Sequence, residues 1–209
     1  MSSSSILAEK HRKELLDSAI SDDVIASRGY TTVTNPKALP VEFTGEQRRL
    51  DGLLIPIRNT EGEIASYQLK PRTPRTFNGK AAKYEHAKGG RMCLDVPDAA
   101  RPYLLDTEAT LWVTEGTKKV DSAVSNGIPC TIGLPGVWMW QQHGPALPDW
   151  RDIALKGREV VIAFDSDVMT KSSVRSALEQ LTGFLRYRNA IVRFCLLPQG
   201  EKRDERGVN

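Results

Sequence analysis

The chain has 209 residues, of which 29 are Lys or Arg and 26 are Asp or Glu, which gives a formal net charge of +3. This length can bury one large core or two small ones, and the three cysteines form no Cys-x-x-Cys pair, which argues against a zinc finger or a disulfide framework. No apolar run approaches the roughly twenty residues of a membrane-spanning helix, and the serine-rich start lacks the apolar stretch of a signal peptide, so we expect a cytoplasmic protein with no membrane partner.

The first half of the chain predicts a small unit of mixed α and β structure. Between residues 8 and 29, apolar residues recur at helical spacing, which predicts a helix or a pair of helices. Two strands are expected at 53–57 and 64–69, joined through the turn sequence Asn59-Thr60-Glu61-Gly62. We therefore expect an amino-terminal subdomain over 1–108 and a second domain over 109–209.

Residues 70–91 hold the basic excess of the chain. The segment contains seven cations against the single acid Glu85, so it carries +6 and the remainder sums to −3. Its proline and glycine residues favour an irregular loop. A solvated charged loop is one interpretation. We favour a track for a phosphate backbone, because phosphate contacts dominate the affinity of proteins for nucleic acids.

The second half alternates strands with helices. The apolar run 111–113 leads into Thr114-Glu115-Gly116 and a helix expected at 117–125, followed by a short strand at 130–132. The run 160–164 leads into Asp165-Ser166-Asp167, an amphipathic helix expected at 172–188 and a strand at 191–197. This alternation predicts an α/β fold with a mainly parallel sheet, in which crossover connections bring successive strand ends to one edge.

Three carboxylates follow buried strands at that edge, namely Glu115, Asp165 and Asp167. Acids that converge in this way repel one another and titrate abnormally unless a cation neutralises them. Their oxygen ligands suit Mg²⁺ or Mn²⁺, which also take substrate phosphates as ligands. The alternatives are that the Asp-x-Asp sequence only caps the next helix and that Gly116 only serves a tight turn.

At these residues the sequence resembles the Toprim family, the catalytic domain shared by DnaG-type primases, topoisomerases and some nucleases. The resemblance continues upstream through 54–64 and Lys83-Tyr84 to the amino-terminal subdomain of the primases, and covers roughly residues 15–200. It is nearest to the primase-like Toprim proteins of phages, plasmids and integrated elements. It implies a Toprim-like, mainly parallel sheet flanked by helices and preceded by a smaller α+β primase-type subdomain. One departure is that the second acid expected four residues after the glutamate is Lys119, with Asp121 two residues further on.

The resemblance implies a metal-dependent nucleotidyltransferase that synthesises primers on single-stranded DNA in the replication of a mobile element. Glu115, Asp165 and Asp167 would form the catalytic metal centre with Mg²⁺ or Mn²⁺. The partners would be the template, nucleoside triphosphates and a replicative helicase, fused or separate. The residues expected at phosphates are Lys70, Arg72, Lys80, Lys83, Lys88, Lys118 and Lys119, although the last two can also simply solvate the start of a helix.

Other activities remain open at this point. A Toprim nuclease would use the same acids with water as the nucleophile, and a non-catalytic nucleic-acid-binding replication module would keep them as structural groups. An Asp-x-Asp phosphatase fits less well, because its nucleophile is expected near the start of the domain. We also expect the chain to be part of a longer protein, because it stops soon after its last predicted strand.

Aromatic and histidine residues carry weaker expectations. Trp138, Trp140 and Trp150 can stack bases, but we expect them to pack a long segment onto the core. The three histidines are His11, His86 and His143. They lack the spacing of metal ligands, and we expect all three at the surface.

Overall fold

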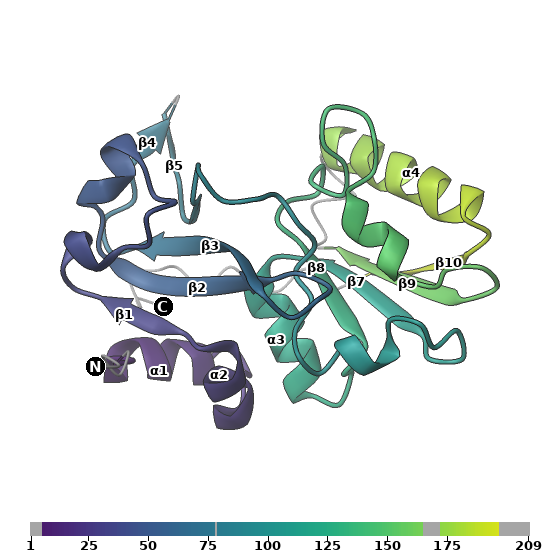
Figure 1. Ribbon diagram of the computed structural model, residues 1–209, viewed down its shortest axis with the longest axis horizontal. Helices are drawn as coiled ribbons and strands as arrows, with labels where there is room; N and C mark the ends of the chain where they lie inside the picture. The colour runs from purple at the N-terminus through teal and green to yellow at the C-terminus, as the bar shows by residue number, and fades with distance from the viewer. Residues whose placement is uncertain (1–5, 78, 165–171, 197–209) are drawn as a thin grey trace, which may run out of the picture.

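The computed structural model describes residues 6–77, 79–164 and 172–196, which form two four-stranded sheets with their helices and one small two-stranded sheet (Figure 1). Among these residues, no helix combines the length and the apolar character needed to cross a membrane. The antiparallel sheet comes first in the chain and the parallel sheet second. The fold is of the mixed α/β class that the sequence predicts, with helices flanking a parallel sheet.

The antiparallel sheet has the strand order β1-β2-β3-β6. Its strands are β1 (Thr31–Val33), β2 (Gly52–Arg58), β3 (Ile64–Pro71) and β6 (Glu85–His86). Because side chains alternate along a strand, β2 feeds two cores. Leu53 and Ile55 pack with the helical pair, whereas Leu54 packs with Phe43 and Leu69 on the other face.

The helical pair consists of α1 (Glu9–Leu16) and α2 (Asp22–Arg28), which lie under the antiparallel sheet (Figure 1). The Oγ of Ser21 accepts a hydrogen bond from the backbone N–H of Val24 and so caps the start of α2. The helix ends at Gly29, whose φ of 81° is the left-handed conformation that glycine adopts most easily. Of the single helix or pair of helices predicted between residues 8 and 29, the structure has the pair.

The parallel sheet has the strand order β10-β9-β7-β8, and all of its pairs are parallel. Its strands are β7 (Leu111–Glu115), β8 (Thr131–Leu134), β9 (Glu159–Phe164) and β10 (Ile191–Leu196). The helix α4 (Ser172–Tyr187) packs Leu181 and Leu185 on the face that carries Val113. The helix α3 (Thr117–Ser125) lies on the opposite face, where Val120 comes close to Gly133 (Figure 1).

Residues 70–91 are more regular than the sequence suggests. They contain β4 (Thr76–Phe77), β5 (Lys80–Ala81) and β6, and β6 pairs with β3 through Gln68 opposite His86. The acid Glu85 is buried in an ion pair with Arg75. The prediction of an irregular loop was therefore only partly right, because β4 and β5 pair with each other and β6 pairs with β3. The remaining elements are single 3₁₀ turns at Pro36–Ala38, Gly45–Arg49, Arg101–Tyr103 and Pro148–Asp152.

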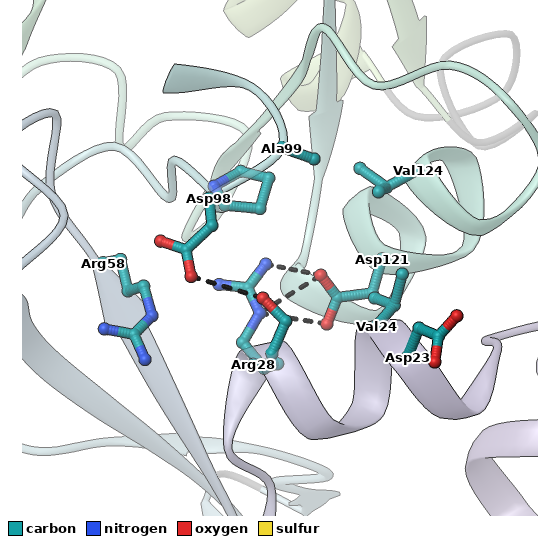
Figure 2. Close-up of a pocket in the computed structure, with 10 residues that line it drawn as sticks. Asp23, Val24, Arg28, Arg58, Asp98, Ala99, Asp121 and Val124 are labelled. Carbon is teal, nitrogen blue, oxygen red and sulfur yellow. Dashed lines mark hydrogen bonds and ion pairs between the residues drawn. The ribbon is translucent and has the colours of Figure 1, made fainter. Parts of the chain in front are cut away.

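A buried charge cluster joins the two sheets. Arg28 Nη1 lies 2.5 Å from Asp95 Oδ1. Arg28 Nη2 lies 2.5 Å from Asp121 Oδ1 on α3, and Figure 2 shows this pair. The hydroxyl of Tyr30 donates to Asp121 Oδ2 at 2.7 Å. Burial alone would lower the pKa of Arg28, but the charges of Asp95 and Asp121 raise it, so the guanidinium stays charged. The cluster fixes α3 against α2.

The aromatic residues follow the expectation in two of three positions. Trp140 and Trp150 are buried and both pack against the ring of Phe184. The distance between ring centroids is 5.2 Å from Trp140 to Phe184 and 5.4 Å from Trp150 to Phe184. Trp138 is exposed. The expectation for His11 was wrong. This side chain is buried, with Nδ1 2.8 Å from the hydroxyl of Thr32 on the neighbouring strand.

Candidate functional site

Glu115 ends β7 at the centre of the parallel sheet. The chain runs from β7 to β8 on one side and then returns to β9 on the other, so the direction of winding reverses between β7 and β9. Ligands of open α/β sheets bind outside the carboxyl ends of the strands at such a switch point. Thr114 lies opposite Ala163 of β9, and Glu115 lies opposite Leu134 of β8. Glu115 is half-buried and stands at the position where this topology places a ligand.

Asp165 and Asp167 lie outside the described residues, and the last described residue of β9 is Phe164. Over 6–77, 79–164 and 172–196, no group of three or more His, Cys, Asp or Glu side chains is arranged to hold a metal ion. Among the three carboxylates predicted to hold a metal, Glu115 is the one that lies within the described residues. The donors would all be carboxylate oxygens, which is the chemistry that Mg²⁺ and Mn²⁺ accept.

Gly116 makes the turn between the strand and the helix. Its φ is 85°, a conformation that residues with a side chain rarely adopt, and a Cβ built there meets no atom within 4 Å. Backbone geometry, and not crowding, therefore requires glycine at this position. The turn lets α3 start at Thr117 and puts Lys118 and Lys119 beside Glu115.

A cleft of about 520 Å³ opens in front of Glu115. Its walls come from both sheets, because β3 and β6 contribute one side and the β7–α3 turn contributes the other. The lining residues are Gln68, Lys83, Tyr84, His86, Glu115, Gly116, Thr117, Lys118, Lys119 and Pro135. The cleft thus sets one carboxylate among three lysines.

Burial and nearby charges shift the pKa values of several groups in and beside the cleft. Burial, followed by the charge of Glu14, raises the pKa of Tyr84 to about 12, so this phenol stays protonated. Burial lowers the pKa of His86, which favours the neutral imidazole. Burial would raise the pKa of Glu14, but hydrogen bonds from Lys118 and Lys70 outweigh it and lower that pKa. Around Glu115, the cleft therefore combines the charges of its lysines with the neutral side chains of Tyr84 and His86.

The predicted phosphate-binding residues are spread over three places. Lys83, Lys118 and Lys119 line the cleft with Glu115. Lys70 and Arg72 line a smaller cleft of about 280 Å³ beside α1, and Lys88 lines a third cavity of about 280 Å³ with Arg91. Lys80 belongs to β5, and its side chain lies outside the described part of the chain.

Acids of the same chain hold Lys70, Arg72 and Lys118. Lys70 Nζ lies 2.9 Å and Lys118 Nζ 2.7 Å from Glu14 Oε1, and Arg72 Nη2 lies 2.9 Å from Asp51 Oδ2. Sequence reasoning missed Glu14, because a single acid on a short helix carries no local signal. Sequence reasoning also assigned no role to Asp121. Asp121 shares the buried stripe of α3 with Thr117 and Val120, and this spacing was the available signal.

Residues 102–209 match a family described as "Domain of unknown function (DUF3854)", and this match covers just over half of the chain. The chain belongs to the DUF3854 family. The matched residues include β7 to β10 and therefore Glu115, Asp165 and Asp167. No curated protein sequence matches this DUF3854 chain.

Solved structures of bacterial primases share the fold of this DUF3854 protein. The Aquifex aeolicus primase (zinc-binding and RNA polymerase domains) aligns with a TM-score of 0.67 and 15% identity over 92% of this chain and 51% of that one. The DnaG primase catalytic domain bound to single-stranded DNA aligns with a TM-score of 0.61 and 19% identity over 92% and 67%.

A third primase structure aligns over a similar share of both chains. The RNA polymerase domain of Mycobacterium tuberculosis DnaG, in complex with double-stranded DNA, aligns with a TM-score of 0.59 and 16% identity over 92% and 67%. The DUF3854 chain thus spans about half to two thirds of the primase chains that it matches. At these identities the likeness shows the fold, which is that of the DnaG primase catalytic core.

Proposed function

We propose that this protein is a primase-like catalytic core, a metal-dependent nucleotidyltransferase of the Toprim type that joins nucleotides on a single-stranded DNA template. The observation that carries the proposal is the position of Glu115. It lies at the switch point of the parallel sheet and faces a cleft with three lysines, in a chain whose fold follows primase catalytic cores over 92% of its length. Two of the solved neighbours described above hold DNA, one single-stranded and one double-stranded.

In this proposal Glu115, Asp165 and Asp167 hold Mg²⁺ or Mn²⁺. The ion supplies positive charge that offsets the charge growing on the transferred phosphoryl group and the leaving oxygen. Glu115 either completes the ligand set or accepts the proton of the attacking 3′ hydroxyl. Both roles require a carboxylate at the end of β7, which is where Glu115 lies.

The lysines of the cleft orient the triphosphate and the template. Lys118 and Lys119 approach from the first turn of α3, and Lys83 approaches from the opposite wall. Contacts to phosphates fix the position of a strand without reading its bases, so we expect priming that tolerates many template sequences.

The proposal extends to the organisation and the context of the protein. We infer that 1–108 forms a primase-type subdomain carrying the basic segment 70–91, and that 109–209 forms the catalytic domain. A role in the replication of a mobile element, with nucleoside triphosphates as substrates and a replicative helicase as partner, rests on the sequence resemblance. Measuring priming with and without a helicase tests this part.

A template-directed extension assay tests the activity. The protein is incubated with a single-stranded template, labelled nucleotides and Mg²⁺ or Mn²⁺, and the products are separated by length. Extension that Asp165→Asn and Glu115→Gln abolish supports the proposal, provided that both variants unfold at the parent temperature. The matched control is Glu179→Gln, an exposed acid on α4, which should extend as the parent does. Degradation of the template would make the protein a nuclease, and binding without either product would make it a non-catalytic module.

A further inference from the structure

Glu14 binds two lysines that come from distant parts of the chain. Its Oε1 atom lies 2.9 Å from Lys70 Nζ, at the end of β3, and 2.7 Å from Lys118 Nζ, in the first turn of α3. The side chains of Glu14, Lys70 and Lys118 are 29%, 37% and 19% exposed, so solvent reaches all three. One carboxylate oxygen therefore neutralises part of the charge of two ammonium groups at a partly open site.

The two lysines belong to neighbouring clefts. Lys70 and Glu14 line the cleft of about 280 Å³ beside α1, together with Lys10 and Arg72. Lys118 lines the cleft of about 520 Å³ in front of Glu115. Glu14 is also near enough to the larger cleft to raise the pKa of Tyr84, after burial. The ion triad of Glu14, Lys70 and Lys118 thus has members in both clefts.

The chemistry of the triad suits exchange with a phosphate. Two ammonium groups that share one carboxylate oxygen keep a net positive charge and are set to receive an anion between them. A phosphodiester offers two charged oxygens, against the single Glu14 oxygen now shared by both lysines. In the exchange each lysine keeps a charged oxygen as its partner, so no ammonium group is left unpaired at this partly buried site. Once Glu14 is displaced, Lys70 of the smaller cleft and Lys118 of the larger cleft can face the same phosphate.

We propose that Glu14 is a built-in competitor for phosphate, which occupies Lys70 and Lys118 in the free protein and is replaced by a phosphodiester of single-stranded nucleic acid. The exchange joins the two clefts into one track that leads to Glu115. The inference rests on the nucleic-acid partner of the proposed function, but it requires neither the metal nor catalysis.

Binding of an oligothymidylate in the presence of EDTA tests the inference, because chelation removes any contribution of a metal centre. Glu14→Gln is compared with Glu9→Gln, which removes the same charge from the same helix at a side chain that is 83% exposed. The apparent Kd equals the intrinsic Kd divided by the fraction of molecules that are open to the ligand. If Glu14 holds the lysines in nine of ten molecules, Glu14→Gln therefore tightens binding about tenfold. Glu9→Gln should change binding by much less.

A double-mutant cycle shows whether the gain passes through the two lysines. In a Lys70→Gln, Lys118→Gln background, Glu14→Gln should tighten binding no more than Glu9→Gln does. Equal effects of Glu14→Gln and Glu9→Gln in the parent would overturn the inference, since they would show a general effect of charge. Weaker binding by Glu14→Gln would also overturn it, since Glu14 would then hold the lysines in their binding geometry.

Two further readouts keep the result interpretable. If Glu14→Gln does not fold, Lys70→Gln and Lys118→Gln carry the test. Each should weaken binding more than Lys37→Gln, which changes an exposed lysine of a 3₁₀ turn, and equal effects would overturn the inference. If the parent binds oligothymidylate and Glu14→Gln binds it equally well, this inference is contradicted and the proposed function is not. A parent protein that binds no oligothymidylate removes the nucleic-acid part of the proposed function as well.

Discussion

Arg28 and Asp121 form a buried ion pair across 93 positions of the chain, with both side chains at most 1% exposed. Arg28 ends α2 of the helical pair and Asp121 lies in the middle of α3, which carries Lys118 and Lys119. Asp95 shares the same guanidinium, so two carboxylates face one buried cation. The orientation of the lysine-bearing turn therefore depends on a charge cluster in the interior and not only on apolar packing.

Replacing Asp121 by Asn should destabilise the protein strongly. The carboxylate of Asp121 accepts hydrogen bonds from Arg28 and from the hydroxyl of Tyr30, and an amide can keep only part of them. Asp95 still balances the charge of Arg28, so the cost is that of weakened hydrogen bonds to a charged group, about 1.5–3 kcal/mol. Urea unfolding measures the change, with Asp23→Asn, an exposed acid of α2, as the control. A loss no larger than that of the control would show that Arg28 is satisfied without Asp121.

The sequence predicts the parts of this fold that local patterns encode. The strands at β2, β3, β7 and β9 and the helices α3 and α4 follow from the spacing of apolar residues, which depends only on near neighbours. The position of Glu115 at a strand end follows for the same reason. The alternation of strands and helices also predicts the parallel sheet, because parallel pairs need long crossovers.

Pairings between distant residues escape this kind of reasoning. The strand β1 has three residues and exists because it pairs with β2, some twenty residues further along. His11 is buried where its ring shares a hydrogen bond with the hydroxyl of Thr32. Lys70 and Lys118 come together because both form an ion pair with Glu14. A charged residue is stable in the interior only when its partner arrives, and no local pattern names that partner.

Glu85 should make stability depend on acid pH. Burial would raise the pKa of Glu85, but hydrogen bonds from Arg75 and Gln47 outweigh it and lower that pKa below the ordinary value of 4.5. A carboxyl with a lowered folded pKa contributes stability that is complete above its unfolded pKa and is lost as the pH falls through the folded value. We therefore expect part of the stability to disappear below about pH 4.5, where the unfolded carboxyl takes up its proton first.

A Glu85→Gln variant checks this assignment. Thermal unfolding between pH 3 and pH 7 should show a smaller acid-side decrease in the variant than in the parent, because the variant has no proton to take up at this position. Identical decreases would assign the acid sensitivity to other carboxyls.

Replacing lysines of the basic segment should reduce the salt dependence of DNA binding. If residues 70–91 follow a phosphate backbone, each of Lys80→Ala, Lys83→Ala and Lys88→Ala removes one contact. The slope of log K against log salt for a single strand then falls by about 0.7 per lost contact. Titrations of an oligothymidylate at several salt concentrations measure the slope, and Lys37→Ala serves as the exposed control. An unchanged slope in the triple variant would show that the segment is only solvated.

Gly116→Ala should reduce both stability and activity, whereas Gly127→Ala should reduce only stability. The two glycines flank α3 with nearly equal φ values of 85° and 84°, and an added Cβ meets no atom within 4 Å at either position. The cost in each case is therefore backbone strain, of order 1–3 kcal/mol, without steric conflict. Only Gly116 sets the turn that follows Glu115, so only its replacement should move the carboxylate and the lysines of the cleft relative to each other. Urea unfolding compares the stability cost, and template extension at a temperature where both variants are folded compares the activity. Equal extension by the two variants would show that the geometry of this turn does not matter to the site.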